Sequence, residues 1–304
     1  MARIAIITGA ASGIGQALAS ALVTRGDTVV VADIDGDGAE RAASELARHG
    51  PGAAVPAVVD VRDAGAVQAL VDQTHEKHGR LDLMVNNAGI GVGGEASGLL
   101  LAHWDRVIDV NLRGVVHGVH AAYPVMVGQG SGHIVNTASL AGLLPSPGVA
   151  AYAMTKHAVV GLSLSLRGEA AAHGVRVTVV CPGFVDTPML DKQGPEDLPR
   201  PTLLNGRGRE YFRHLQPRFY PADRLAQDIV RGIDRNSALV IAPRSARVAW
   251  QLWRYAPMVV TQMTQRQLAW ARTTFAIQPA EAGSEPDPRP PTGPDPQPPL
   301  VDMH

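Results

Sequence analysis

The chain has 304 residues, enough for one large α/β domain or two small ones and for a sizeable buried core. Its formal net charge of −1 predicts no nucleic-acid partner, and its single cysteine excludes an intramolecular disulfide and a multi-cysteine metal site; no metal is predicted. The first residues lack the charged and apolar regions of a secretory signal, and no apolar stretch reaches the roughly 18 residues of a membrane span. We therefore expect a cytoplasmic protein.

Short apolar runs rich in β-branched residues alternate with helical patterns along most of the chain. The predicted strands are residues 3–8, 28–33, 54–59, 83–86, 133–137, 175–180 and 239–242. The predicted helices are residues 13–25, 38–49, 64–78, 103–127, 150–173 and 222–236. This alternation predicts a Rossmann-type, doubly wound parallel β-sheet with helices on both faces.

The rest of the chain departs from this rhythm. Residues 189–220 contain several prolines and glycines, which predicts a long loop with short helical pieces, a common form for lids and binding loops. Residues 244–278 predict a C-terminal helical extension to a domain at 1–243, with Pro257 separating two helical segments. Residues 279–304 contain nine prolines and no periodic apolar positions, so we expect a disordered tail.

The first predicted strand runs into a glycine-rich turn that opens a helix. Glycines allow a tight turn and close approach of the backbone to a pyrophosphate, and the helix start offers free N–H groups to it. A flexible loop without a ligand is the alternative. The candidate cofactor-binding residues here are Gly9, Ala11, Ser12, Gly13, Ile14 and Gly15.

A carboxylate closes the second predicted strand. Asp33 is placed to accept hydrogen bonds from an adenosine ribose and to repel a 2′-phosphate, which predicts NAD rather than NADP. Neither Ile34 nor Ser12 offers a cation to such a phosphate, whereas Arg41, one or two helical turns further on, argues the other way. A turn or helix-cap role for Asp33 near Gly36 is the alternative.

Two more strands end in candidate cofactor contacts, because ligands bind such sheets beyond the carboxyl ends of their strands. These residues are Asp60 and Val61 after the third strand, and Asn87, Ala88 and Gly89 after the fourth.

Four side chains form the candidate catalytic set. Tyr152 and Lys156 stand four residues apart at a predicted helix start, so both lie on one face. An ammonium beside a phenol favours the phenolate, and we expect it to lower the pKa of Tyr152 from about 10 toward neutrality. Ser139 closes the fifth strand and can donate a hydrogen bond to a carbonyl oxygen. Taken singly, each has an ordinary structural explanation, such as a cap or core amide for Asn111.

The motifs occur together and in order. Thr-Gly-x-x-x-Gly-x-Gly, Asn-Asn-Ala-Gly, a serine thirteen residues before Tyr-x-x-x-Lys, and Pro-Gly-x-x-x-Thr-Pro closely resemble the short, single-domain branch of the short-chain dehydrogenase/reductase family over residues 3–243. The resemblance implies that Tyr152 transfers a proton and that Ser139 orients the substrate oxygen. It also implies that Lys156 holds the nicotinamide ribose, with Tyr152 beside the cofactor, and that Asn111 supports a proton relay. It further implies a nicotinamide-binding loop that includes Pro182, Gly183, Val185 and Thr187.

We therefore expect an oxidoreductase that moves hydride between a nicotinamide cofactor and a secondary alcohol or ketone. Residues 91–96, 140–149 and 189–220 should line the substrate site, and their small or apolar character favours a lipophilic substrate. A catalytically silent dinucleotide-binding regulator or scaffold is the alternative, although it would have no use for Ser139, Tyr152 and Lys156 together. Reduction of a C=C bond or an epimerisation on the same fold also stays open.

Two features concern assembly. The helix predicted from residue 150 is apolar over much of its circumference, and similar proteins pair through this helix and the one before it, so we expect a homodimer or homotetramer. The segment 244–278 has five arginines, no acidic residue and three of the four tryptophans. It is interpreted as packing on a subunit or on its own domain, as a lid over an apolar substrate, or as a peripheral contact with an anionic membrane.

Overall fold

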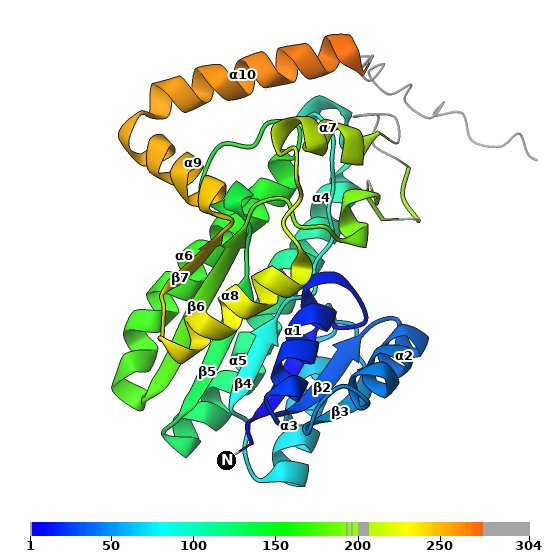
Figure 1. Cartoon of the computed structure of the whole chain (residues 1–304), viewed down its shortest axis with the longest axis vertical. Helices are drawn as coiled ribbons and strands as arrows, with labels where there is room; N and C mark the ends of the chain where they lie inside the picture. The colour runs from blue at the N-terminus through cyan, green and yellow to red at the C-terminus, as the bar shows by residue number, and fades with distance from the viewer. Residues whose placement is uncertain (1, 193, 196, 200–206, 276–304) are drawn as a thin grey trace, which may run out of the picture.

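The computed structural model describes residues 2–192, 194–195, 197–199 and 207–275. Seven parallel strands form one sheet in the order β3-β2-β1-β4-β5-β6-β7 (Figure 1). Their bounds are β1 Ile4–Thr8, β2 Thr28–Asp33, β3 Ala53–Val58, β4 Leu83–Asn86, β5 Gly132–Thr137, β6 Val175–Pro182 and β7 Leu239–Ala242. The predicted Rossmann-type, doubly wound fold is confirmed.

Helices cover both faces of the sheet. On one face, α1 (Gly13–Thr24), α2 (Gly36–Leu46) and α8 (Ala222–Asp234) pack on one buried cluster, and on the other, α3 (Ala64–His78), α5 (Gly114–Gln129) and α6 (Ala150–Ala170) pack on a second. Successive side chains of a strand point to opposite faces of the sheet, so each strand contributes to both clusters. Ile7 belongs to the first cluster and its neighbour Ile6 to the second. Because both faces are covered, the strands are apolar nearly throughout.

The helix predicted over residues 103–127 is present, but a π-helical turn that was not predicted divides it. The structure has α4 (Leu101–Ile108), then a π-helical turn η2 (Asp109–Arg113), then α5. The helix also starts earlier than predicted, because the buried His103 ring accepts a hydrogen bond from the Leu100 backbone N–H through Nδ1 at 3.0 Å. One extra residue in the turn re-aims the side chains that follow, and such turns often occur at functional sites.

The second helix also begins earlier than predicted, at Gly36 rather than at residue 38. Asp35 is its N-cap, and the Asp35 carboxylate accepts a hydrogen bond from the Gly38 backbone N–H at 2.9 Å. The helix-cap role considered for Asp33 therefore belongs to its neighbour two residues on.

Residues 189–220 contain a short turn, η5 (Pro188–Leu190), and one helix, α7 (Gly208–Leu215), in their described parts. After β7 the chain forms α9 (Arg244–Tyr255) and α10 (Pro257–Thr274), and Pro257 starts the second helix as predicted. The predicted tail at 279–304 lies outside the described residues. Among the helices of the described ranges, none has both the length and the apolarity needed to cross a bilayer.

The strand order places the candidate site. The chain moves outward from β1 in one direction to β2 and β3, then returns to the other side of β1 at β4. The segments after β1 and β4 therefore lead to helices on opposite faces of the sheet, and ligands bind such sheets beyond the carboxyl edge at this point. The candidate residues after β1, β2, β4, β5 and β6 all belong to this edge.

Candidate active site

Glycines allow the turn after β1 to pass close to the loop after β4. Gly9 has φ +65°, and a Cβ at this position would lie 2.7 Å from the Ala88 Cα atom. A Cβ on Gly15 would lie 2.3 Å from the Gly9 carbonyl oxygen and 2.7 Å from the Asn87 side-chain amide. Any larger residue at either position would push the two loops apart. The glycine pattern is thus explained first by close packing between these two loops.

The start of α1 leaves a positive helix end without local compensation. In the described structure the Ser12 side chain makes no capping hydrogen bond, and the first turn contains no acidic residue. The N–H groups at a helix start carry partial positive charge and bind phosphate well. Gly13, with φ +58°, lies beside Thr187 of the loop after β6, which closes this side of the turn. The residues present fit the pyrophosphate of a dinucleotide.

Asp33 joins the end of β2 to the glycine-rich turn. One carboxylate oxygen, Oδ2, accepts a hydrogen bond from the Ala11 backbone N–H at 2.9 Å, and Oδ1 accepts one from Asp35 N–H at 3.1 Å. The side chain is half-buried at the carboxyl edge. It therefore combines a turn role with the position that suits a ribose contact.

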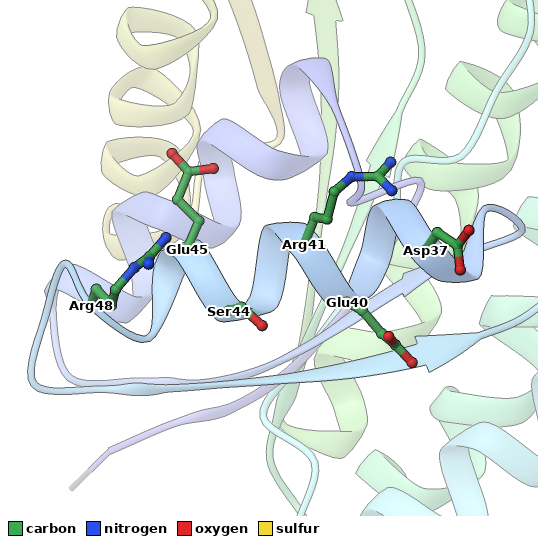
Figure 2. A pocket seen from close by; sticks show the side chains of 6 residues that line it. All are labelled: Asp37, Glu40, Arg41, Ser44, Glu45 and Arg48. Carbon is green, nitrogen blue, oxygen red and sulfur yellow. The ribbon is translucent and has the colours of Figure 1, made fainter.

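Arg41 is the cation that argues against an NAD site. Figure 2 shows it extending from α2 among side chains of mixed charge that line an open hollow: Asp37, Glu40, Arg41, Ser44, Glu45 and Arg48. Its guanidinium lies 3.8 Å from the Asp35 carboxylate, and both side chains are well exposed. The three carboxylates of the hollow outnumber its two arginines, so this surface does not favour an added phosphate.

The two candidates after β3 have local partners. The Asp60 carboxylate receives hydrogen bonds from the Arg62 guanidinium at 2.6 to 3.0 Å, which lower the pKa of Asp60. Val61 is buried against Gly114, and its carbonyl oxygen lies 2.8 Å from His117 Nδ1. The two residues thus lie on the wall that joins the end of β3 to α5.

The loop after β4 is held by a residue that the sequence reasoning missed. The Thr8 hydroxyl oxygen accepts hydrogen bonds from the backbone N–H groups of Asn87 at 3.0 Å and Ala88 at 3.1 Å. The Asn87 side-chain amide in turn donates to the Thr8 carbonyl oxygen at 3.0 Å. A threonine at the end of β1 was the available signal, since its hydroxyl can bind backbone groups of the adjacent strand's loop.

Asn111 lies in the π-helical turn and is fully buried. Its side-chain oxygen accepts from the Ile90 backbone N–H at 2.8 Å, and its amide donates to the Ile90 carbonyl oxygen at 2.9 Å. A Cβ on Gly89 would lie 3.2 Å from the Asn111 oxygen and 3.5 Å from Lys156 Nζ. Gly89 therefore fills the narrow space between these two polar side chains.

The remaining three candidates meet where β5 ends and α6 begins. Lys156 is buried, and its Nζ donates to the Thr137 carbonyl oxygen at 2.9 Å. The Ser139 Oγ accepts from the Ala141 backbone N–H at 3.1 Å, and the Ser139 hydroxyl is also a hydrogen-bond partner of Tyr152. Nζ lies 5.6 Å from the centroid of the Tyr152 ring.

The predicted lowering of the tyrosine pKa is wrong. Burial raises the pKa of Tyr152 above its usual value, and the hydrogen bond with Ser139 opposes that rise without cancelling it. Burial also lowers the pKa of Lys156 to about 8, because a low-dielectric site disfavours the ammonium. Spacing on a helix could not show that both groups are desolvated. Tyr152 is thus a protonated phenol near neutral pH, which suits it to donate a proton.

Apolar side chains surround the tyrosine. The Gly94 backbone N–H donates to the Gly148 carbonyl oxygen at 2.8 Å, which joins two of the segments expected to line the substrate site. Val92, Val107 and Ala151 form a buried cluster against which Tyr152 packs. The Tyr152 ring therefore packs on an apolar part of the core.

The loop after β6 is fixed at both ends. The Gly183 backbone N–H donates to the Ala242 carbonyl oxygen at 2.8 Å, and Val185 pairs with Tyr220. Pro182 ends β6 itself. Arg209 of α7, which the sequence reasoning missed, binds the carboxylates of Asp186 and Asp191 at 2.7 Å each and the Thr187 carbonyl oxygen at 3.1 Å. No sequence motif marked this arginine.

The end of α10 packs over the same side of the molecule. Tyr211, Ala271 and Phe275 form a small buried cluster, and the rings of His214 and Trp270 stack with centroids 4.0 Å apart. Figure 1 shows α10 and α7 together at this end of the chain fold. The predicted packing of the extension on its own domain is therefore present at this end of α10.

One ion pair ties α10 to the loop after β4. The Arg272 guanidinium donates to the Glu95 carboxylate at 2.8 and 2.5 Å, which lowers the pKa of Glu95. The sequence reasoning placed Arg272 only within a basic stretch, because a contact across 177 residues leaves no local pattern.

Known proteins are similar to this chain in sequence. A family model described as short chain dehydrogenase matches residues 3–198. A "probable oxidoreductase EphD" of Mycobacterium tuberculosis is 35% identical over 261 residues, which are 84% of this chain but 43% of that relative, so this chain spans less than half its length. The 3-oxoacyl-[acyl-carrier-protein] reductase FabG of Thermotoga maritima is 37% identical over 190 residues, 62% of this chain and 77% of FabG.

Solved structures of known proteins have a similar fold. A short-chain dehydrogenase/reductase from Burkholderia phymatum in complex with NAD superposes with a TM-score of 0.77 at 32% identity, covering 85% of this chain and 95% of that one. A short-chain dehydrogenase from Sphingobium yanoikuyae in complex with NADPH gives 0.70 at 25% identity, covering 86% and 95%. With its parallel sheet, glycine-rich turn and Ser-Tyr-Lys grouping, the chain belongs to the short-chain dehydrogenase/reductase family of oxidoreductases.

Proposed function

We propose that this oxidoreductase interconverts a lipophilic ketone and the corresponding secondary alcohol with a nicotinamide cofactor. The observation that carries the proposal is the grouping of Ser139, Tyr152 and Lys156 at the junction of β5 and α6, beside Asn111 and Gly89. We assign all these groups to a domain at residues 1–243, with residues 244–278 as its extension. A silent scaffold would not need a buried ammonium beside a hydrogen-bonded phenol.

Each side chain of the catalytic set has its own role in carbonyl reduction. The Tyr152 hydroxyl holds a proton near neutral pH and donates it to the carbonyl oxygen, while the Ser139 hydroxyl donates a hydrogen bond to the same oxygen. Charged Lys156 stabilises the negative charge left on the phenolate. Asn111 positions the loop around Gly89 through its two hydrogen bonds with Ile90, and it supports return of a proton to the tyrosine.

The cofactor supplies the hydride when bound. The turn residues Gly9, Ala11, Ser12, Gly13, Ile14 and Gly15 would hold its pyrophosphate, and Asp33 its adenosine ribose. Asp60 and Val61 would flank the adenine, and Asn87, Ala88 and Gly89 would flank the riboses. Tyr152, Lys156, Pro182, Gly183, Val185 and Thr187 would contact the nicotinamide half.

Turnover with a graded substrate series tests this function. We expect NADH oxidation with cyclic or long-chain aliphatic ketones and less with short polar ketones, since the segments expected to line the site, 91–96 and 140–149, are mainly small or apolar. Simple alkenes conjugated to a carbonyl serve as the comparison for C=C reduction. Cofactor binding without turnover of any member of the series would instead favour the scaffold.

We expect kcat/KM with NADH to exceed that with NADPH, because the Asp33 carboxylate repels a 2′-phosphate and Arg41 is paired with Asp35. Asp33→Asn should lower this preference by about tenfold, since it removes the charge but keeps an oxygen that can accept from Ala11 N–H. Asp37→Asn removes a nearby charge on α2 as the control. A wild-type preference for NADPH would refute the assignment.

We also expect a homodimer or homotetramer through α5 and α6. Val116 on α5 and Leu164 on α6 are both exposed in the single chain, at 42% and 41%. Light scattering at micromolar concentration should give a multiple of the chain mass. Leu164→Glu should lower that mass, whereas Val58→Glu, at the exposed edge strand β3, should not. A single-chain mass for the wild type would contradict the prediction.

A further inference from the structure

A surface patch at the junction of α9 and α10 plays no part in the proposed site. Figure 1 shows the two helices meeting in a corner that projects beyond the sheet. Tyr255 is 84% exposed, Met258 69% and Val248 63%. We call the following residues the corner patch: Val248, Leu252, Tyr255, Met258, Val259 and Met263, all of them exposed. Soluble proteins rarely expose large apolar patches to water, so a group of exposed apolar side chains at one corner suggests an interaction site.

The corner patch is not required for packing within the chain. The inward sides of the helices already supply the buried contacts: Ala246 and Trp250 pack with Val159 and Ile241 in one cluster, and Val260 is buried on α10. Helical spacing places Val248, Leu252 and Tyr255 in one row on the other side of α9. These apolar side chains are therefore available to a partner.

The surroundings of the corner patch are basic. Residues 244–275 contain five arginines and no acidic residue. Within the described part of the chain, only Arg272 has an acidic partner, Glu95. The other four are Arg244, Arg247, Arg254 and Arg266, of which Arg254 lies 5.2 Å from the Trp250 ring centroid. A partner that covers the corner patch must therefore also carry negative charge.

A second copy of the chain fits this requirement poorly. Two copies that met through the same patch would form a self-complementary interface and bring arginines against arginines. An anionic bilayer fits well, because apolar side chains enter the acyl boundary while arginines remain at the phosphates. A projecting corner can also reach a flat surface. We propose that the corner patch docks the protein reversibly on anionic phospholipid membranes.

The docked state would lie in the plane of the interface. No helix of the described residues is suited to span a bilayer, so the contact is limited to one face of α9 and the start of α10. The opposite end of α10 packs on α7 and pairs with Glu95. The inference does not depend on the proposed reaction, because none of the corner residues belongs to the catalytic or cofactor-binding set.

Sedimentation with vesicles tests the proposal. The full chain is used, since residues 279–304 contribute five carboxylates that can compete with lipid phosphates for the arginines. Vesicles of equal parts phosphatidylglycerol and phosphatidylcholine should bind the protein, and vesicles of phosphatidylcholine alone should bind it far less. Added salt should weaken the binding, because it screens the arginine contacts.

Two double variants separate the apolar and charged contributions. Arg247→Gln with Arg254→Gln should lower the partition coefficient about 25-fold, at about fivefold per charge. Tyr255→Ser with Met258→Ser should also lower it at least tenfold, while both proteins retain wild-type turnover in solution. The matched control is Arg48→Gln, just after α2, with Val58→Ser on β3, at the opposite edge of the sheet, and it should bind like the wild type.

Three results would overturn the proposal. The first is equal binding to charged and neutral vesicles, or to neither. The second is equal binding by the corner variants and the matched control. The third is a fall in oligomer mass of the Tyr255→Ser, Met258→Ser protein by light scattering, which would assign the corner patch to contact between chains. Circular dichroism and turnover of each variant verify that the variants are folded.

Discussion

Tyr152→Phe should abolish carbonyl reduction while leaving cofactor binding intact. The change removes one hydroxyl, and that hydroxyl is the proton donor in the proposed reaction. General acid catalysis of this kind contributes roughly 10²- to 10⁴-fold, so kcat should fall by that factor. Titration of NADH fluorescence measures the binding that should remain. The phenyl ring keeps its packing against Val92, Val107 and Ala151, so the fold should be preserved.

A second tyrosine provides the control for this substitution. Tyr123 lies on α5, outside the catalytic set. Its ring packs edge-to-face on that of His173, with the ring centroids 6.4 Å apart. Tyr123→Phe removes the same hydroxyl from a position without a proposed role, and kcat should stay near the wild-type value. If Tyr152→Phe also kept near-wild-type kcat, the proposed acid would be wrong, even if the protein proved to be an oxidoreductase.

Lys156→Met should reduce kcat/KM for the ketone by at least about 100-fold. The ammonium donates to the Thr137 carbonyl oxygen, and its loss leaves that buried oxygen without this partner and the forming phenolate without a nearby cation. Lys77→Met, at an exposed site on α3, is the control with the same chemical change. A small effect at Lys156 would remove the lysine from the mechanism.

The pH dependence gives an independent test of the same group. Burial lowers the pKa of Lys156 to about 8, so kcat/KM for reduction should decline as the pH rises through about 8 and the ammonium loses its proton. The free energy of unfolding should move the other way. Between about pH 8 and 10 the unfolded chain binds this proton and the native chain does not, so the contribution of Lys156 to stability rises with pH. Loss of activity without loss of stability would support the assignment.

The local sequence was sufficient to predict the sheet. Each strand is a short apolar run, and the pattern is strongest in the central strands β1, β2, β4 and β5, which are buried nearly throughout. The bounds of β2, β4 and β7 match the predicted residues. Two helix starts were misplaced because side chains capped them: Asp35 for α2 and His103 for α4. Such caps depend on side-chain geometry that periodicity does not record.

The sequence by itself determined the parallel fold, the family and the order of the site motifs, because these depend on residue type, spacing and position within alternating strands and helices. Only the tertiary structure decided the state of the site. It showed the π-helical turn at Asn111, the raised pKa of Tyr152 and the Arg272–Glu95 ion pair. Each of these depends on burial or on contact between segments far apart in the chain, and neither quantity is a property of local sequence.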